Sequence, residues 1–426
     1  PMGLYDLHKK FGKLKWETLF LVPLKLAEEG FQVSGEWVTK TNGEKDRFSP
    51  GGLNAFFKAE QKNLLPGEIL KQPKLAQALK LFRDRGPDGF YKGPVAVDIQ
   101  NTVKKTSGVI TTEDLAKYKT RWLKPLKTTF NGHDVYLMPP PSSGGVVIAQ
   151  ALALIEQFKL SEKPHLSIDE LHLMGEIQSR SYRGRALLGD PDFHKNPLEK
   201  LLSAGEIAKL AKSINVKKAT TLQALDEAKY VEEKSNETTH FSVMDAQGNA
   251  VSLTTTLNGN YGSGVVSERY GVALNNEMDD FTTQPDKPNM FGLIQGKGNQ
   301  VEPGKRPLSS MSPTLVVKDG KTVLNLGAPG GPRIISSVLQ VIYRVIGRGM
   351  DVDRAVQAPR LHHQFSPNTL YADKESLSPL VIEALQKKGH KMDEGWMAKV
   401  YAIVRTPEGL LKAAYDQRGE GAAGGF

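Results

Sequence analysis

The stretch "KSNETTHFSV" (234–243) marks the point at which the character of this sequence changes. Before it, the chain has mainly helical patterns of apolar residues. After it, short β-type runs alternate with glycine, asparagine and aspartate. The stretch itself begins polar and turn-prone and ends as an alternating strand. A helical first half followed by a strand-rich second half predicts a layered sandwich of helices and sheets, of the α/β or α+β kind.

A second threonine-rich run, "LTTTLN" (253–258), follows so closely that the two runs predict a β-hairpin. The turn between them, "DAQGN" (245–249), is centred on Gln247. In a symmetric antiparallel hairpin, Thr238 and Thr256 then lie opposite each other or nearly so, within reach of each other's side chains. Cross-strand threonine pairs are common because β-branched residues suit the pleat. On the hairpin alone, a purely structural pair is the favoured interpretation.

Composition excludes several classes of function. The 426 residues are 39% apolar and 24% charged, as in a soluble globular protein, and there is no cysteine to form disulfides, reactive thiolates or metal ligands. The formal charge of +9 is dispersed along the first half with matching acids, whereas nucleic-acid binding usually needs a concentrated basic face. The adjacent histidines of "LHHQF" (361–365) point to opposite faces of a strand, so a metal site is not expected there.

Neither a membrane span nor a signal peptide is predicted. The longest apolar run (144–158) is interrupted by Gln150, is too short to span a bilayer, and is interpreted as a buried helix. Because the sequence opens at Pro1 without an initiator methionine, we expect its natural start, with any targeting signal, to lie upstream.

Further motifs occur in a fixed order around the hairpin. They are "FYKG" (90–93), "MPPPSSGG" (138–145), "LGDPDF" (188–193), "NETTHFSVMDAQGNAVSLTTTLN" (236–258), "LNNEMDDF" (274–281), "KRPLSSMSPT" (305–314) and "GAPGGPRI" (327–334). In this order they resemble the γ-glutamyltranspeptidase family, also called glutathione hydrolase, over nearly the whole chain. Members of that family are N-terminal nucleophile hydrolases, in which a precursor cuts itself before a threonine that becomes the nucleophile.

By this resemblance, the cut bond is Glu237–Thr238, Thr238 is the nucleophile, and Thr256 hydrogen-bonds its hydroxyl. A threonine hydroxyl needs a base at neutral pH, and a freed α-amino group, with a pKa near about 7.7 to 8.0, is poised to act as one. The polar segment "EEKSNE" (232–237) is expected to be an exposed loop. His240, two residues along the strand, is interpreted as structural rather than catalytic.

The remaining motifs resemble a pocket for an amino acid. A γ-glutamyl group carries an α-ammonium, which needs acceptors, and an α-carboxylate, which needs donors. By family match, Asn258, Glu277 and Asp280 contact the α-amino end, while Ser309 and Ser310 contact the α-carboxylate. Without the resemblance, the acidic run would be interpreted as a solvated turn and the serines as a simple loop.

The glycines of "GAPGG", Gly330 and Gly331, match the family's oxyanion hole, where their backbone N–H groups would meet the tetrahedral intermediate. The family needs no metal and no organic cofactor. Three departures stand out. The arginine of the family's "DFRE" motif, which pairs with the substrate α-carboxylate, has no counterpart. Phe291 stands where some bacterial members have a lid tyrosine, and Gly184 replaces the acidic residue of "YADR".

The resemblance implies a four-layer αββα sandwich of the α+β class, with at least one outer element missing. Residues 1–237 would form a large-subunit portion and 238–426 a small subunit, together one αββα unit and a heterodimer of the chain's own cleavage products. The implied function is γ-glutamyl transfer from glutathione or related amides to water or to amino-acid or peptide acceptors, in the periplasm or outside the cell. A cephalosporin or glutaryl-type acylase and an inactive relative are the alternatives; the amino-group site favours a substrate with an α-amine.

Overall fold

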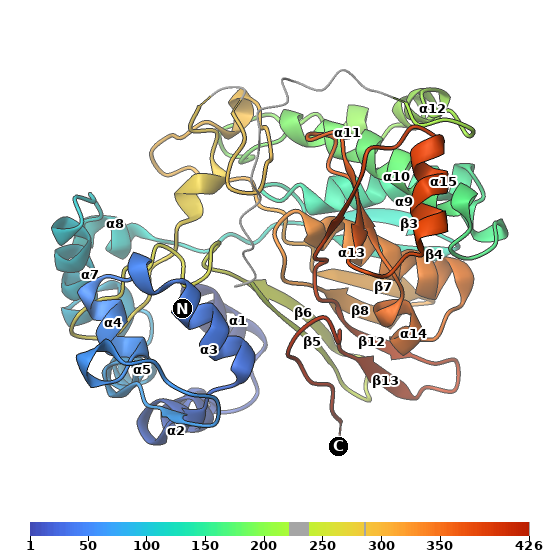
Figure 1. The fold of residues 1–426 in the computed structure, drawn as a ribbon. Helices are drawn as coiled ribbons and strands as arrows, with labels where there is room; N and C mark the ends of the chain where they lie inside the picture. The colour runs from blue at the N-terminus through green and yellow to red at the C-terminus, as the bar shows by residue number, and fades with distance from the viewer. Residues whose placement is uncertain (221–237, 285–286, 426) are drawn as a thin grey trace. The chain divides into compact units, whose positions relative to one another are not determined.

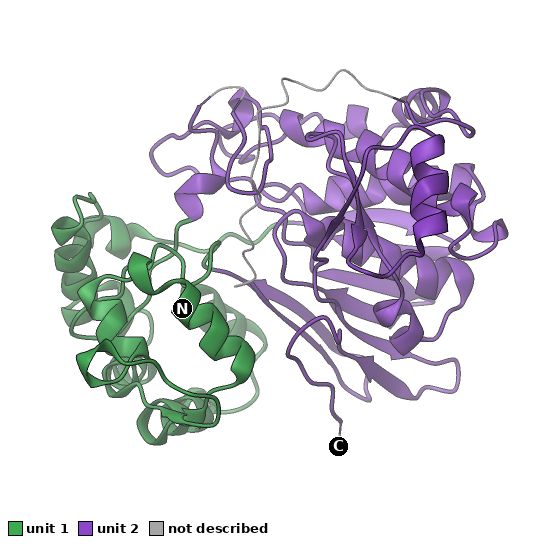
Figure 2. Ribbon diagram, viewed as in Figure 1, with its two compact units in different colours: residues 1–123, 257–276 green, residues 124–256, 277–426 purple. Residues whose placement is uncertain are grey.

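The computed structural model describes residues 1–220, 238–284 and 287–425, which divide into two compact units (Figure 2). Unit 1 comprises Pro1–Leu123 and Leu257–Asn276, and unit 2 comprises Lys124–Thr256 and Glu277–Phe426. Each unit therefore draws on chain from both sides of residue 237, so the two units do not coincide with the two predicted subunits.

Unit 1 is mainly helical. Its elements are α1 (Met2–Phe11), α2 (Leu21–Glu29), β1 (Phe31–Gln32), α3 (Gly35–Gly43), α4 (Pro50–Phe56), β2 (Ile69–Leu70), α5 (Pro73–Arg85), α6 (Asp88–Tyr91), α7 (Pro94–Lys105) and α8 (Thr112–Lys117). The segment Leu257–Asn276 packs on the helices of this unit through an aromatic cluster, in which the ring of Tyr261 contacts Phe48 and Phe56. The Tyr261 and Thr41 hydroxyls are 2.5 Å apart within the cluster.

A six-stranded antiparallel sheet forms the centre of unit 2, in the order β13–β12–β8–β7–β4–β3 (Figure 1). Its strands are β3 (Leu126–Phe130), β4 (His133–Leu137), β7 (Thr314–Lys318), β8 (Lys321–Gly327), β12 (Tyr401–Arg405) and β13 (Leu411–Ala414). The sheet combines strands from both sides of residue 237, because β4, which precedes that residue, pairs with β7, which follows it.

Helices cover one face of this sheet. The apolar run predicted as a buried helix forms α9 (Gly144–Gln157), which packs on β3 and β4, and α13 (Arg333–Ile342) packs on α9 and β8. The core lies in this layer, where α9 and α13 bury their apolar side chains against those of β8, such as Leu324 and Leu326. Helix α10 (Ile168–Arg183) packs on α9 from outside.

The predicted hairpin covers the other face. Strands β5 (Thr239–Met244) and β6 (Ala250–Thr255) pack against β8, and Asn325 of β8 donates to the carbonyls of Val243 (3.0 Å) and Val251 (2.8 Å). Because side chains alternate along a strand, Asn325 faces the hairpin while its neighbours Leu324 and Leu326 face the helices. Unit 2 therefore contains an α layer, a β layer and a second β layer in succession, and the mixed class predicted from the sequence is confirmed.

A small sheet and four further helices complete the described part of unit 2. A three-stranded sheet, β9 (Leu361–His362), β10 (Leu370–Asp373) and β11 (Met392–Gly395), contacts α10 and α13 through β9. The other helices are α11 (Leu198–Leu201), α12 (Ala204–Lys212), α14 (Val352–Gln357) and α15 (Pro379–Lys387). Within the described ranges, no helix combines the length and the hydropathy that crossing a membrane requires.

Candidate active site

The hairpin brings Thr238 and Thr256 together. The register pairs Thr239 with Thr255, as the symmetric turn predicts, and the Thr238 hydroxyl donates a 3.0 Å hydrogen bond to the Thr256 hydroxyl. Thr238 is only 9% exposed. The predicted geometry of this pair is thus confirmed. Glu237, and with it the loop expected over 232–237, lies outside the described residues.

His240 is held as a neutral structural residue on the face of β5 that meets β8. Its Nδ1 lies 2.8 Å from the Thr254 hydroxyl and its Nε2 lies 3.0 Å from the Ser242 hydroxyl. Burial lowers the pKa of His240 to about 4, so the ring is uncharged at neutral pH. A Cβ on Gly327 would come within 2.2 Å of the ring, which explains the glycine at the end of β8.

Glu277 and Asp280 form an acidic pair on a short 3₁₀ helix, Glu277–Asp280. Burial raises the pKa of Glu277, and it raises the pKa of Asp280 well above its usual range, with a further contribution from the Glu277 charge. Protonation of one of the two carboxyl groups is favoured in such a site, because ionising both would bury two like charges. A cationic ligand group would favour the doubly ionised pair.

The backbone around Asp280 is fixed by two buried amides. Its backbone carbonyl accepts hydrogen bonds from the side-chain amides of Gln295 (2.8 Å) and Asn299 (2.7 Å), while the side-chain Oδ1 of Asn299 accepts from the N–H of Leu308 (2.9 Å). Asn299 therefore joins the acidic pair to the loop that carries Ser309.

Ser309 and Ser310 lie half-buried beside the "MPPPSSGG" segment. The Ser309 carbonyl accepts from the N–H (2.9 Å) and the hydroxyl (3.0 Å) of Ser143, and the Ser309 hydroxyl accepts from the N–H of Met311 (3.0 Å). The Ser309 O–H is left able to donate to a ligand, as the predicted carboxylate contact requires.

Arg185 supports both parts of the site and was not predicted from the sequence. Its guanidinium donates to the Ser143 hydroxyl and to the Leu308 carbonyl, both at 3.0 Å, and its positive charge acts on Asp280. Burial lowers the pKa of Arg185 to about 10, so it remains a cation at neutral pH. Only its position directly after Gly184, in a motif already matched to the family, could have drawn attention to it.

Gly330 and Gly331 form a turn that leads into α13. Their φ angles of 135° and 52° lie where residues with a Cβ are strained. A Cβ on Gly331 would come within 2.9 Å of the Phe291 ring. Phe291 is itself tied down, because its carbonyl accepts from Gln364 (2.9 Å) and its N–H donates to Asn289 (3.0 Å). The Phe291 ring therefore packs directly on this turn.

Asn258 is the one predicted site residue that belongs to unit 1. It is buried, has a φ of 74°, and donates to the Asn276 carbonyl at 3.3 Å. The other predicted residues in the described chain all lie in unit 2, where hydrogen bonds or packing join them into a threonine pair, an acidic pair, a serine loop and a glycine turn. In the described residues, no group of histidine and acidic side chains has the arrangement of a metal site.

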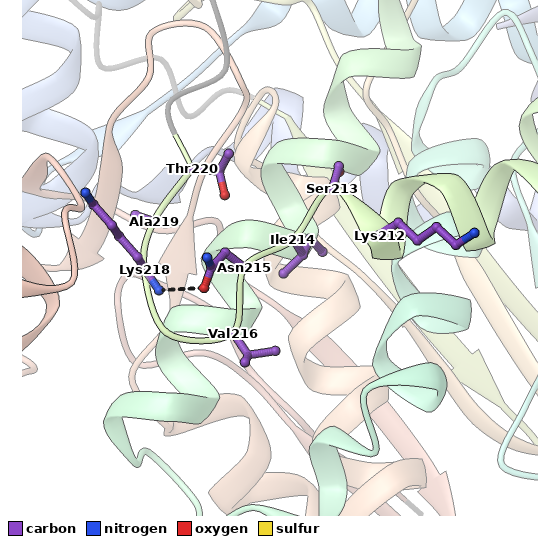
Figure 3. A pocket seen from close by; sticks show the side chains of 8 residues that line it. All are labelled: Lys212, Ser213, Ile214, Asn215, Val216, Lys218, Ala219 and Thr220. Carbon is purple, nitrogen blue, oxygen red and sulfur yellow. Dashed lines mark hydrogen bonds between the residues drawn. The ribbon is translucent and has the colours of Figure 1, made fainter.

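A separate open cavity of about 660 Å³ lies along residues 212–220 and contains none of these side chains (Figure 3). Its wall is a loop in which the N–H of Lys218 donates to the Asn215 side chain at 3.2 Å, the bond dashed in Figure 3. Nothing in its lining places it with the candidate site.

Comparison with known proteins shows which family this chain resembles. A family model described as gamma-glutamyltranspeptidase matches residues 1–426. The glutathione hydrolase proenzyme of Escherichia coli is 41% identical over 413 residues, which cover 96% of this chain and 71% of that protein. The glutathione hydrolase proenzyme of Pseudomonas aeruginosa is 39% identical, over 99% of this chain and 75% of its own length. A crystal structure of a cephalosporin acylase from Bacillus halodurans superposes with a TM-score of 0.82 over 98% of this chain and 76% of that one, at 23% identity, which shows a shared fold alone.

Proposed function

Because the chain belongs to the γ-glutamyltranspeptidase family, we propose that it is a γ-glutamyltransferase and glutathione hydrolase that uses Thr238 as its nucleophile. The observation that carries the proposal is the hydrogen bond from the Thr238 hydroxyl to Thr256, which fixes the direction of that hydroxyl at the start of β5. The relatives named glutathione hydrolase supply the substrate class.

Autocleavage between Glu237 and Thr238 is part of the proposal. The two resulting pieces, 1–237 and 238–426, would stay associated as a heterodimer. The six-stranded sheet supports this association, because its strands β3 and β4 come from the first piece and β7, β8, β12 and β13 come from the second. Separating the pieces would break the β4–β7 pairing at the centre of the core.

The proposed reaction begins when the Thr238 hydroxyl attacks the γ-carbonyl carbon of the substrate. The freed α-amino group of Thr238 takes the hydroxyl proton, and the N–H groups of Gly330 and Gly331 stabilise the oxyanion. As the tetrahedral intermediate collapses, the C–N bond breaks and the leaving amine takes the proton. Water or an acceptor amine then attacks the threonyl ester, and the threonine hydroxyl is restored.

The substrate's amino-acid end would be held by charge. Glu277 and Asp280, with Asn258, would accept from the α-ammonium, and the hydroxyls of Ser309 and Ser310 would donate to the α-carboxylate. This assignment also separates the proposal from a glutaryl-type acylase, since a glutaryl group has no ammonium for the acidic pair to bind.

Intact-mass analysis tests the proposal. The wild-type protein should yield a piece that begins at Thr238, and Thr238→Ala should remain a single chain without hydrolysis of γ-glutamyl-p-nitroanilide. Thr238→Ser, which keeps a hydroxyl, should cleave slowly and retain partial activity. A wild-type protein that turns over this substrate as one uncut chain would overturn the mechanism, and a single inactive chain would favour the inactive-relative alternative.

A further inference from the structure

A cavity of about 240 Å³ in unit 2 adjoins the Gly330–Gly331 turn and has no role in the mechanism above. Two of its lining residues make hydrogen bonds to residues that adjoin or contact that turn. Tyr182 donates to the Pro332 carbonyl at 2.6 Å, and Gln364 donates to the carbonyl of Phe291, whose ring packs on Gly331. The volume suits a group the size of an amino acid.

The charge of this cavity is positive. Arg185 lines its interior and is 3% exposed, and Arg183 is exposed and lies over the Phe365 ring at 5.9 Å. Among the described residues, no aspartate or glutamate lines it. Its remaining walls include the apolar side chains of Leu293 and Phe365.

One nitrogen of the Arg185 guanidinium, Nη1, makes no hydrogen bond within the described residues. Nε and Nη2 donate to Ser143 and Leu308, whereas Nη1 is buried and has no hydrogen-bond partner among the described residues. A buried cationic N–H without an acceptor is costly, and a carboxylate oxygen satisfies both its charge and its hydrogen bond. Asp280 compensates the charge only in part, because burial favours the protonated form of its carboxyl group.

We propose that this cavity binds the carboxylate of the amino-acid or dipeptide acceptor, which the positive charges of Arg183 and Arg185 attract, with Leu293 and Phe365 against the carbon skeleton. The inference rests on the proposed function, in which Ser309 and Ser310 already serve the donor's carboxylate. An acceptor held here would lie next to the Gly330–Gly331 turn, the proposed oxyanion site for the ester of Thr238, with its amine free to attack.

Transfer from γ-glutamyl-p-nitroanilide to glycylglycine and to glycylglycinamide tests the proposal, because these acceptors differ only in the terminal carboxylate. The wild-type KM for glycylglycine should be about 10-fold lower than that for the amide, as expected for one hydrogen bond to a charged group. Ala186→Leu should fill the cavity without removing the guanidinium, raise the KM for glycylglycine about 10-fold, and leave the amide and donor hydrolysis unchanged. Ala204→Leu, exposed at the start of α12, is the matched control.

Arg183→Gln provides a second variant that should fold normally because its side chain is exposed. It should raise the KM for glycylglycine two- to threefold at low ionic strength, with the effect lost in high salt. Equal changes for both acceptors would overturn the carboxylate assignment, and a raised KM for the donor alone would assign the cavity to the donor instead. Absence of donor hydrolysis in the wild-type protein would refute the proposed function itself.

Discussion

Single buried charges decide the chemistry that the candidate site can perform. Asp280 and Glu277 have raised pKa values because they are buried together, while Arg185 remains charged because its pKa of about 10 is still far above neutrality. An ammonium ligand would pair with the ionised acids and release the proton that they otherwise share. The affinity for an ammonium substrate therefore depends on the ionisation of Asp280.

Replacement of Asp280 by asparagine tests this dependence. Asp280→Asn keeps the size but removes the charge, so the KM for γ-glutamyl-p-nitroanilide should rise about 10- to 100-fold, while use of a glutaryl anilide changes little. In the wild-type protein, KM for the γ-glutamyl substrate should rise as pH falls through the raised pKa of Asp280, because protonation removes the charge that binds ammonium.

Asp279→Asn, on the neighbouring residue whose carboxylate accepts from the Met290 N–H at 3.1 Å, is the control. Because the Asp279 charge is one of the contributions that raise the pKa of Asp280, this variant should keep the rise in KM but shift it to lower pH. Equal losses of the γ-glutamyl and glutaryl substrates in Asp280→Asn would contradict the assignment of the ammonium to this residue.

At the scale of elements, the turn between β8 and α13 is defined by backbone conformation and by the residue above it. Gly330 and Gly331 adopt positive φ, and Phe291 closes on the second of them. The segment around Phe291 is in turn fixed by Asn289 and Gln364. The turn is therefore rigid, as a site that stabilises a developing charge requires.

Gly331→Ala should disturb this turn more than positive φ alone explains. Gly349 has a similar φ of 64° but open space around it, so Gly349→Ala should cost only about 1 kcal/mol of unfolding free energy from backbone strain. Gly331→Ala adds a contact of 2.9 Å with the Phe291 ring and should lower kcat at least 10-fold. Denaturant unfolding and steady-state kinetics on both variants measure these effects. Equal changes in unfolding free energy and in kcat for the two variants would show that the Phe291 ring moves aside without cost.

At the scale of the whole molecule, one face of α10 holds the chain that leads toward the predicted cleavage site. His172, Glu176 and Arg180 follow one another at four-residue spacing and are all buried. The His172 Nε2–H donates to the Asn215 carbonyl (2.8 Å), Glu176 accepts from the N–H of Thr220 (3.3 Å), and Arg180 donates to the Ser213 carbonyl (3.0 Å). Since Nε2 of His172 must carry its proton, Nδ1 accepts from His390 Nε2 at 2.8 Å.

This buried histidine pair predicts a loss of stability in acid. Burial lowers the pKa of His390 to about 3, and it also lowers that of His172. The unfolded chain binds protons near pH 6.5 while the folded pair does not, so the free energy of unfolding should fall as pH drops from about 6.5 toward 3. Each such histidine contributes about 1.4 kcal/mol per pH unit.

His390→Gln keeps an N–H donor for His172 and removes one titrating group. The slope of the unfolding free energy against pH should therefore decrease by about 1.4 kcal/mol per pH unit, the contribution of one proton. Urea unfolding at pH 7.0, 6.0 and 5.0 measures this slope. His8→Gln is the control, because His8 belongs to unit 1, where its ring lies 2.8 Å from the Leu14 carbonyl and 5.1 Å from the Trp16 ring, and is only partly buried. An unchanged slope in His390→Gln would contradict the assignment of that proton uptake to the pair.

The sequence by itself determined the features that depend on local order along the chain. The symmetric turn around Gln247 set the hairpin register, and with it the contact of Thr238 with Thr256. The apolar run at 144–158 determined a buried helix, and the ordered motifs identified the family. These predictions succeed because hairpin pairing and helix burial follow from residue spacing alone.

Only the tertiary structure decided which distant segments meet. Arg185 reaches Leu308 across 123 residues, and Asn299 connects Asp280 to the serine loop. No spacing in the sequence encodes these contacts, because they arise where α10, the glycine turn and the loops of unit 2 pack around a common core. Burial in that core, rather than residue type, raises the pKa of Asp280 and leaves the guanidinium of Arg185 with an N–H group that has no acceptor in the described part of the chain.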